Sequence, residues 1–303
     1  MVATFRTTLF AFTALFSLAA CGGSESSETE NSADITDVSL EPLSKATTTE
    51  VVQLERPDVA APESTPTELI ITDIFEGTGR AVAEGDTVWV DYTGIRSEDG
   101  LEFDNSYQRG EPIAFTVGIG SVIEGWDTGL IGAKAGGQRR LDIPADMAYG
   151  DNPPGGVIEA GDALTFMLEI RAVVATSTAD DIPDIDTTDY PPTEELVLVD
   201  LSQGEGATIK AGDSAIVHFL IGNAESGEIL FETWSEGQPR PPIKVVEGYS
   251  IPGLYEGLQG MTVGGIRVMS VPSELAFGDE GIPDLGLAGG TPVLLVVELV
   301  GTY

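Results

Sequence analysis

Short segments in which apolar residues occupy every second position recur along this chain. Val88, Val90 and Tyr92 form one such segment, and another runs from Leu164 to Ile170. A period of two residues predicts a strand with one buried face, and the Gly-Asp pairs shortly before both segments indicate turns. Only residues 125–131 are predicted to be helical. The pattern therefore predicts an α+β fold in which an antiparallel sheet wraps around one short helix.

A glycine-rich octapeptide occurs twice in the chain. Residues 125–132, GWDTGLIG, are echoed by residues 253–260, GLYEGLQG, and further matches follow at the same spacing. Self-similarity of this kind indicates two copies of one domain. We therefore predict domains at residues 67–174 and 195–303, each an antiparallel half-barrel sheet wrapped on one short helix.

Two acidic segments are predicted to act as connections. Residues 21–66 are rich in Ser, Thr, Glu and Ala, whereas residues 175–194 contain five Asp, three Pro and no basic residue. Such compositions favour disorder, so we predict a disordered acidic tether at 21–66 and an extended, proline-containing linker at 175–194. The formal net charge of −36 is then explained largely by solubility and by self-repulsion of these segments. A cation-binding acidic strip is the less favoured alternative.

The N-terminus has the features of an export signal. Arg6 is the only charged side chain before an apolar run from Leu9 to Ala20, which is too short to span a bilayer of about 30 Å. The sequence LAAC that ends at Cys21 resembles a bacterial lipobox. We therefore expect residues 1–20 to be a lipoprotein signal peptide. An ordinary cleavage site that happens to contain cysteine is the alternative.

The lipobox resemblance also predicts where the protein is located. Acylation of Cys21, with diacylglycerol and palmitate, would anchor the chain outside the cytoplasm, to the cell membrane or the outer membrane. Several acyl chains on one residue give stable anchoring, whereas a single chain is marginal.

Composition excludes several classes of site. The chain contains one cysteine and one histidine, too few for a structural zinc site or an internal disulfide. A net charge of −36 repels phosphate backbones, so nucleic acid is not an expected partner. We expect neither a metal ion nor another cofactor.

Four ordered motifs carry a family resemblance. They are VDYTG at residues 90–94, FDNS at 103–106, VIEGW at 122–126 and AYG at 148–150. With these gaps they resemble the FKBP-type peptidyl-prolyl cis-trans isomerases, and the tandem arrangement behind a lipobox resembles bacterial lipoproteins of this family. The resemblance implies an enzyme that isomerises X-Pro bonds of exported proteins. It also implies proline-containing polypeptides as substrates and macrolides as further ligands.

Isomerisation of an X-Pro bond requires no nucleophile, because no covalent bond breaks. The barrier of about 18–20 kcal/mol arises from amide resonance. A catalyst therefore has to bind the twisted amide more tightly than the planar one. An apolar cup for the prolyl ring, with one or two hydrogen-bond donors for the rotated carbonyl, would meet this requirement.

The resemblance assigns such a cup to the first domain. It implies that Trp126 forms the floor, that the Ile123 N–H and the Tyr149 hydroxyl donate to substrate carbonyls, and that Asp104 shapes a polar edge. Together with Tyr92, these residues form the predicted catalytic set. The predicted substrate-binding residues are Phe103, Ile113, Val122, Val157, Ile158 and Phe166. Plain core packing is the alternative role for these aromatic side chains.

Ile113 departs from the family pattern. The family often has an aromatic wall at this position, so the departure puts macrolide affinity and substrate preference in doubt more than it does activity.

The second copy departs much further from the family motifs. Phe219, Leu254 and Phe277 replace the two tyrosines and the tryptophan of the predicted cup, so both phenol hydroxyls and the indole are lost. The alternation of apolar residues persists, which predicts that the fold is retained. We predict a degenerate isomerase domain used for binding or spacing. For the whole chain, the alternative function is a polypeptide-binding chaperone or adaptor without turnover.

Two further predictions concern the alignment of the copies, and a third concerns His218. We align Glu232 with Asp104, and Leu295 with Phe166. His218 lies on the strand face opposite its neighbour Phe219, so we predict that it faces solvent.

Overall fold

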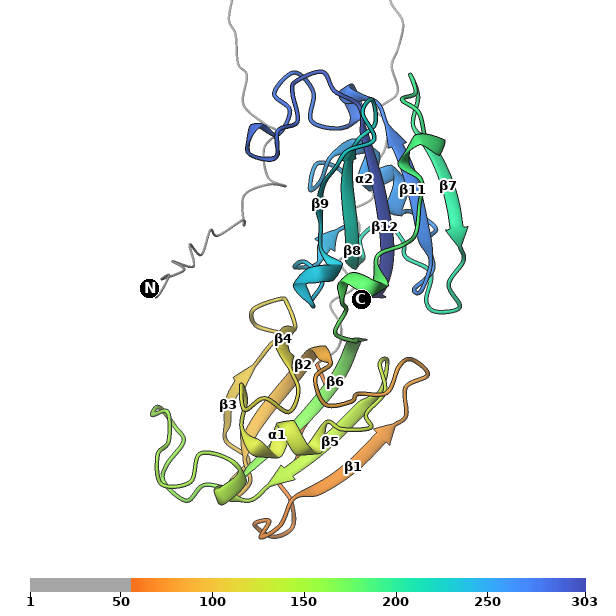
Figure 1. Cartoon of the computed structure of the whole chain (residues 1–303). Helices are drawn as coiled ribbons and strands as arrows, with labels where there is room; N and C mark the ends of the chain where they lie inside the picture. Colours follow the sequence, from red (N-terminus) through yellow and green to blue (C-terminus); the bar gives the residue numbers. More distant parts are fainter. Residues whose placement is uncertain (1–55) are drawn as a thin grey trace, which may run out of the picture.

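The computed structural model describes residues 56–303, which form two antiparallel sheets (Figure 1). The first sheet has the strand order β1-β5-β6-β2-β3, and β4 pairs with β2. The elements of this domain are β1 (Ile70–Phe75), β2 (Thr87–Arg96), β3 (Glu102–Asn105), β4 (Ile113–Thr116), α1 (Glu124–Gly129), β5 (Gln138–Ile143), η1 (Ala145–Met147) and β6 (Leu164–Val174). The sheet wraps around the short helix α1, which confirms the predicted fold class.

The second domain repeats this arrangement. Its sheet has the order β10-β8-β12-β11-β7, and β9 pairs with β8. Its elements are β7 (Val197–Ser202), β8 (Ser214–Asn223), β9 (Ile229–Glu232), η4 (Trp234–Glu236), β10 (Ile243–Lys244), α2 (Pro252–Leu258), β11 (Ile266–Val271), η5 (Ser273–Leu275), η6 (Pro283–Leu285) and β12 (Val293–Thr302).

Repeated glycines let each helix lie close to its sheet. A Cβ atom on Gly125 of α1 would lie 2.7 Å from Ile143 Cδ1 on β5, too close unless the helix or the Ile143 side chain shifts. Gly129 faces β5 in the same way, and Gly253 and Gly257 of α2 face β11. The glycine pattern of the repeated octapeptide is thus explained by close helix–sheet packing.

The linker is packed against the second domain, whereas its composition predicts an extended segment. It contains two 3-10 turns, η2 (Ala179–Asp181) and η3 (Thr187–Asp189). Three of its apolar side chains cover the sheet face opposite α2, next to the fully buried Trp234: they are Ile182, Ile185 and Tyr190. Apolar side chains placed between the aspartates supply the contacts that order the segment.

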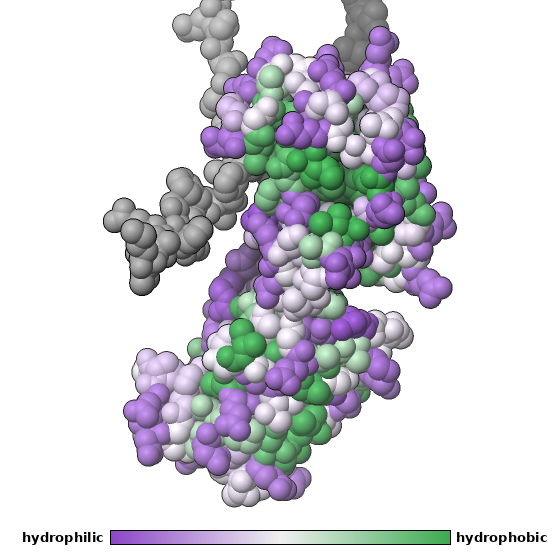
Figure 2. Space-filling model, in the orientation of Figure 1, coloured by the Kyte–Doolittle hydropathy of each residue, from purple (hydrophilic) through white to green (hydrophobic). Residues whose placement is uncertain are grey.

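The two domains meet where β6 and β12 run close together (Figure 1). Trp89 of the first domain is 4% exposed and belongs to one buried apolar cluster with Ile216 of the second domain. Gln238 Nε2 donates to Thr116 Oγ1 at 2.7 Å across the junction. Figure 2 shows extensive apolar surface on the second domain, drawn above the first.

The N-terminal predictions mostly fall outside the described residues. The proposed signal peptide, Cys21 and residues 22–55 of the tether are among these. The remaining part of the tether contacts the first domain, because Arg56 pairs with Glu102 and Arg140 Nη1 donates to the Ala60 carbonyl at 2.8 Å. Within residues 56–303, no helix is long and apolar enough to cross a membrane.

Candidate active site

Four aromatic rings from four elements meet between α1 and the first sheet. We call this set, Tyr92, Phe103, Trp126 and Phe166, the aromatic cup. The Trp126 ring lies edge-on to Tyr92 at a centroid distance of 5.2 Å and to Phe166 at 5.1 Å. Phe103 meets Phe166 in the same manner at 5.5 Å. Edge-to-face contacts of this kind are favoured by the ring quadrupoles, and the structure brings the four predicted residues together.

Gly94 makes room for two of these rings. It lies two residues after Tyr92 on β2 and therefore on the same face of the strand. A Cβ atom at this position would lie 2.7 Å from both Phe103 Cζ and Phe166 Cε1. The absence of a side chain at Gly94 is therefore a condition for the aromatic cup.

Phe115 is a further aromatic contact that the sequence analysis did not single out. Its ring lies 5.6 Å from that of Trp126. Phe115 and Ile113 are two residues apart on β4, and both pack against the core of the first domain. Strand β4 thus supplies an aromatic contact to Trp126 through Phe115, although Ile113 stands where the family often has an aromatic residue. The alternation of β4 was the signal that could have identified it.

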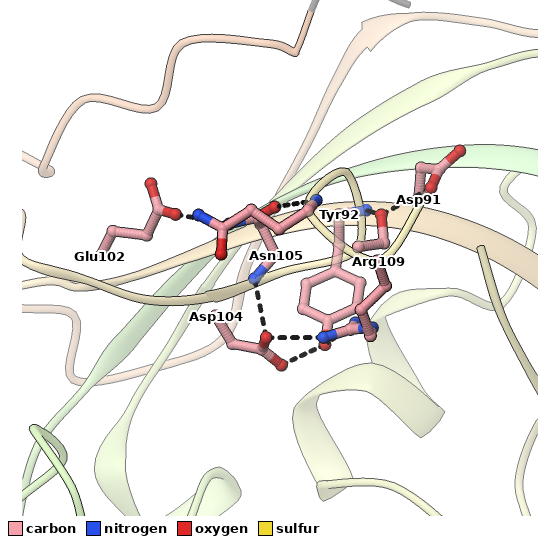
Figure 3. Close-up of polar contacts among 8 residues, drawn as sticks. Asp91, Tyr92, Glu102, Asp104, Asn105 and Arg109 are labelled. Atoms are coloured by element: carbon pink, nitrogen blue, oxygen red, sulfur yellow. Dashed lines mark hydrogen bonds and ion pairs between the residues drawn. The ribbon is translucent and has the colours of Figure 1, made fainter. Parts of the chain in front are cut away.

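A network of polar groups lies at the edge of the cup (Figure 3). The Tyr92 hydroxyl donates to Asp104 Oδ2. Arg109 Nη1 contacts Asp104 Oδ1 at 2.8 Å, and Arg109 Nη2 donates to the Tyr92 hydroxyl at 2.7 Å (Figure 3). The guanidinium also lies over the Tyr92 ring, 5.3 Å from its centroid. Sequence analysis predicted Tyr92 and Asp104 but missed Arg109, which lies in a turn without periodicity.

Burial, followed by the hydrogen bond to Asp104, raises the pKa of Tyr92 to about 12. The folded chain therefore holds this proton more tightly than the unfolded chain, whose tyrosine has a pKa of about 10. This stabilisation is complete below about pH 10 and is lost as the pH rises through about 12. In a spectrophotometric titration, we expect Tyr92→Phe to remove a phenol that ionises near pH 12. Removal of a phenol with an ordinary pKa would contradict this expectation.

The remaining predicted residues differ in their placement. Tyr149 is 37% exposed, and burial together with the charge of Asp104 raises its pKa. Ile158 is 7% exposed and belongs to the same buried cluster as Trp126. Val157 is not brought into this cluster: its side chain is 41% exposed, and its carbonyl accepts from an arginine at 2.9 Å. Its contact with substrate stays a prediction.

The segment before α1 is held by a carboxylate of the helix. Val122 and Ile123 are half-buried against the core, and the Ile123 carbonyl accepts from the Trp126 N–H at 2.9 Å. Asp127 accepts from the N–H groups of Gly118 and Gly120 at 2.9 and 2.8 Å. Asp127, which the sequence analysis did not single out, therefore ties the preceding loop to the helix.

The corresponding space in the second domain is nearly closed. Strand register places Ile221 at the position of Gly94, and Leu295 at that of Phe166 as predicted. The remaining cavity of about 10 Å³ is lined only by apolar side chains: Val217, Phe219, Ile221, Ile251, Leu254, Phe277, Leu295 and Val297. This domain therefore offers neither an open cup nor the phenol and indole groups of the first.

One predicted equivalence between the copies is wrong. The Ser106 N–H donates to a β2 carbonyl at 3.0 Å, and the Thr233 N–H makes the same bond to β8 at 3.1 Å. The residues two positions earlier, Asp104 and Phe231, therefore correspond. Glu232 lies one residue further along, because the two copies differ by one residue between this strand and the next helix. A phenylalanine thus stands where the first domain has its edge carboxylate.

His218 is buried, contrary to the prediction that it faces solvent. Only 2% of its surface is exposed, and its ring stacks on Trp234 at a centroid distance of 5.5 Å. Its Nδ1 lies 3.1 Å from Thr233 Oγ1. Burial lowers the pKa of His218. The strand face was assigned correctly, but Trp234 and the packed linker shield that face from solvent.

Both domains match one family model. The model is described as FKBP-type peptidyl-prolyl cis-trans isomerase, and it matches residues 78–171 and 205–300. The structures of AtFKBP13 and of FkpA from Escherichia coli are 34% and 41% identical in sequence, with TM-scores of 0.33 and 0.32. Each covers 35% of this chain, which corresponds to 93% and 48% of those chains.

Relatives are found in bacteria and animals. An FK506-binding protein of Streptomyces anulatus is 45% identical over 124 residues, which are 40% of this chain and 100% of that protein. The mouse peptidyl-prolyl cis-trans isomerase FKBP10 is 33% identical over 205 residues, 68% of this chain and 32% of that protein. With two matched domains and relatives of this similarity, the chain belongs to the FKBP-type peptidyl-prolyl cis-trans isomerase family.

Proposed function

We propose that the aromatic cup of the first domain isomerises X-Pro bonds in exported polypeptides. The observation that carries this proposal is the contrast between the two domains. The first has four rings, two of which pack into the room that Gly94 leaves, with the hydrogen-bonded groups of Tyr92, Asp104 and Arg109 at their edge. The second retains only a closed apolar cavity of about 10 Å³.

In this mechanism the prolyl ring lies on Trp126, and the walls of the cup exclude water. The twisted amide has lost its resonance and is less polar than the planar form, so an apolar environment favours it. The Ile123 N–H and the Tyr149 hydroxyl donate hydrogen bonds to the carbonyls that flank the rotating bond. Donors already in position stabilise the transition state without reorganisation. Asp104 and Arg109 keep the Tyr92 ring oriented at the edge of the cup.

A protease-coupled assay with a proline peptide tests this function. We expect the whole chain to accelerate cis–trans exchange, and Tyr149→Phe to lower kcat/KM about twofold to tenfold, the equivalent of one hydrogen bond. Tyr249→Phe is a matched control, because it removes a 58% exposed phenol from the second domain, and should leave activity unchanged. Peptide binding without acceleration would favour the chaperone or adaptor function instead.

We also propose that the cup accepts macrolides. The support is the similarity to relatives named FK506-binding protein. Ile113 offers less surface than an aromatic side chain would, but Phe115 adds a ring from the same strand.

The proposed location depends on Cys21. We propose that cleavage after residue 20 and acylation of Cys21 anchor the protein to a membrane outside the cytoplasm, with residues 22–66 as the tether. In cells of a lipoprotein-processing bacterium, Cys21→Ser should abolish labelling with a fatty-acid analogue and partitioning into the detergent phase. Unchanged membrane association of this variant would mean that the apolar run remains as an uncleaved anchor.

A further inference from the structure

A buried polar chain lies behind the aromatic cup, on the opposite face of β2. Asp91 precedes Tyr92 on this strand, so the two side chains point to opposite faces. The fully buried Ser106 connects them: its Oγ accepts from the Tyr92 N–H at 2.9 Å and donates to Asp91 Oδ1 at 2.5 Å. Asp91 is 6% exposed, and its other oxygen accepts from Arg171 Nε at 2.7 Å.

Ser106 also begins the turn that delivers Arg109. Its N–H donates to the Tyr92 carbonyl at 3.0 Å, and its own carbonyl accepts from the Arg109 N–H at 2.9 Å and the Gly110 N–H at 3.1 Å. The backbones of Tyr92 and Arg109 are therefore both hydrogen-bonded to Ser106. Ser106 thus fixes the segments that carry the phenol and the guanidinium at the edge of the cup. A shift of this turn would separate Arg109 from Tyr92 and Asp104.

In the second domain, Thr233 connects Phe219 and His218 as Ser106 connects Tyr92 and Asp91. We call each of these connections a link. The second domain has the link but lacks the polar groups at the edge of the cup. Thr233 Oγ1 accepts from the Phe219 N–H at 2.9 Å and lies 3.1 Å from His218 Nδ1. Strand register pairs Asp91 with Glu169 and His218 with Glu298, so the two links occupy equivalent places. In this domain, however, the residue that the link holds is Phe219, which lacks the hydroxyl group of Tyr92.

The charge of Asp91 explains why the first domain needs Arg171. A buried carboxylate without a partner is strongly unfavourable, whereas a neutral imidazole is not. Arg171 lies at the bulge between β2 and β6, and also contacts Glu169 at 2.5 Å. The bulge residue of the second domain is Val300, an apolar side chain where the first domain has Arg171. Arg171 therefore fixes the position of the Asp91 carboxylate, and Asp91 in turn fixes the Ser106 hydroxyl.

We propose that Ser106, fixed by Asp91 and Arg171, is a positioning residue that aligns Tyr92, Asp104 and Arg109 for isomerisation. This inference rests on the proposed function of the aromatic cup. Ser106 touches no substrate; it acts by fixing the strand and the turn from which the polar edge is built. Its loss therefore affects the transition state, which requires this alignment, more than it affects ground-state binding.

The test compares full-length variants in the isomerase assay and in the tyrosine titration. For Ser106→Ala, we expect kcat to fall about fivefold to twentyfold with little change in KM, equivalent to roughly 1–2 kcal/mol in the barrier. The pKa of Tyr92 should fall from about 12 toward its ordinary value, because water reaches the loosened edge. Ser106→Thr, which installs the residue of the second domain, should retain at least half of the activity.

Thr233→Ala is the matched control. It removes the same buried hydrogen bond from the second domain, so it should lower the thermal unfolding midpoint and leave kcat unchanged. Equal losses of activity in Ser106→Ala and Thr233→Ala would show a purely structural role and overturn the inference. Wild-type kcat in a folded Ser106→Ala protein would overturn it as well. An inactive wild-type chain would instead overturn the proposed function.

Asp91→Ala decides the question if Ser106→Ala does not fold. This variant leaves the Ser106 hydroxyl bonded to the Tyr92 N–H but removes its acceptor and the partner of Arg171. We expect a threefold to tenfold lower kcat, again with little change in KM. The double variant Asp91→His, Arg171→Val, which reproduces the second domain, should recover most of this loss. Wild-type kcat for Asp91→Ala, or no recovery in the double variant, would overturn the inference.

Discussion

Replacement of Gly94 by isoleucine is expected to remove most of the isomerase activity and leave the chain folded. A Cβ atom here would lie 2.7 Å from the rings of both Phe103 and Phe166, so these rings must move. Overpacking of this kind costs about 1–3 kcal/mol in stability. If the displaced rings no longer form the cup, kcat/KM should fall about tenfold to hundredfold in the proline-peptide assay.

Ile221→Gly is the reciprocal control for this prediction. It opens the closed cavity of the second domain and should lower the unfolding midpoint by removing buried apolar surface. Activity should stay at the wild-type level. A Gly94→Ile protein with full turnover would show that the arrangement of the Phe103 and Phe166 rings at Gly94 is not needed.

Trp126→Leu is expected to produce the second large effect. The indole contacts three other rings, Tyr92 at 5.2 Å, Phe166 at 5.1 Å and Phe115 at 5.6 Å, and leucine cannot reach all of them. Complete truncation to alanine would cost about 3–5 kcal/mol of stability, and leucine should cost less because it keeps an apolar side chain. We expect a folded protein with kcat/KM at least about tenfold lower.

The reciprocal change, Leu254→Trp, separates packing from chemistry. The second cavity of about 10 Å³ has no space for an indole, so this variant should be destabilised and should gain no activity. Full wild-type turnover of Trp126→Leu would contradict the proposed role of the floor. It would also remove the reason for regarding the second domain as degenerate.

The fold and the inward placement of Tyr92 and Phe166 were predictable from local patterns, whereas the assignment of the aromatic cup came from the resemblance to the FKBP family. Strand alternation places Tyr92 and Phe166 on inward faces, and the repeated glycines mark the helix that carries Trp126. These signals are local because side-chain direction alternates along a strand and glycine permits close packing wherever it occurs. The repeat therefore predicted two similar domains. The replacement of the tyrosines and the tryptophan in the second copy predicted that only the first would retain the cup.

Contacts between distant segments could not be predicted in this way. Arg109 reaches Tyr92 only because a turn folds back over the strand, and a turn has no periodicity that identifies such a residue. The same limit explains the errors at His218 and in the linker. Alternation shows which side chains share a strand face, but what covers that face depends on the path of the rest of the chain. Only the folded chain brings Trp234 over His218 and places Ser106 between Tyr92 and Asp91.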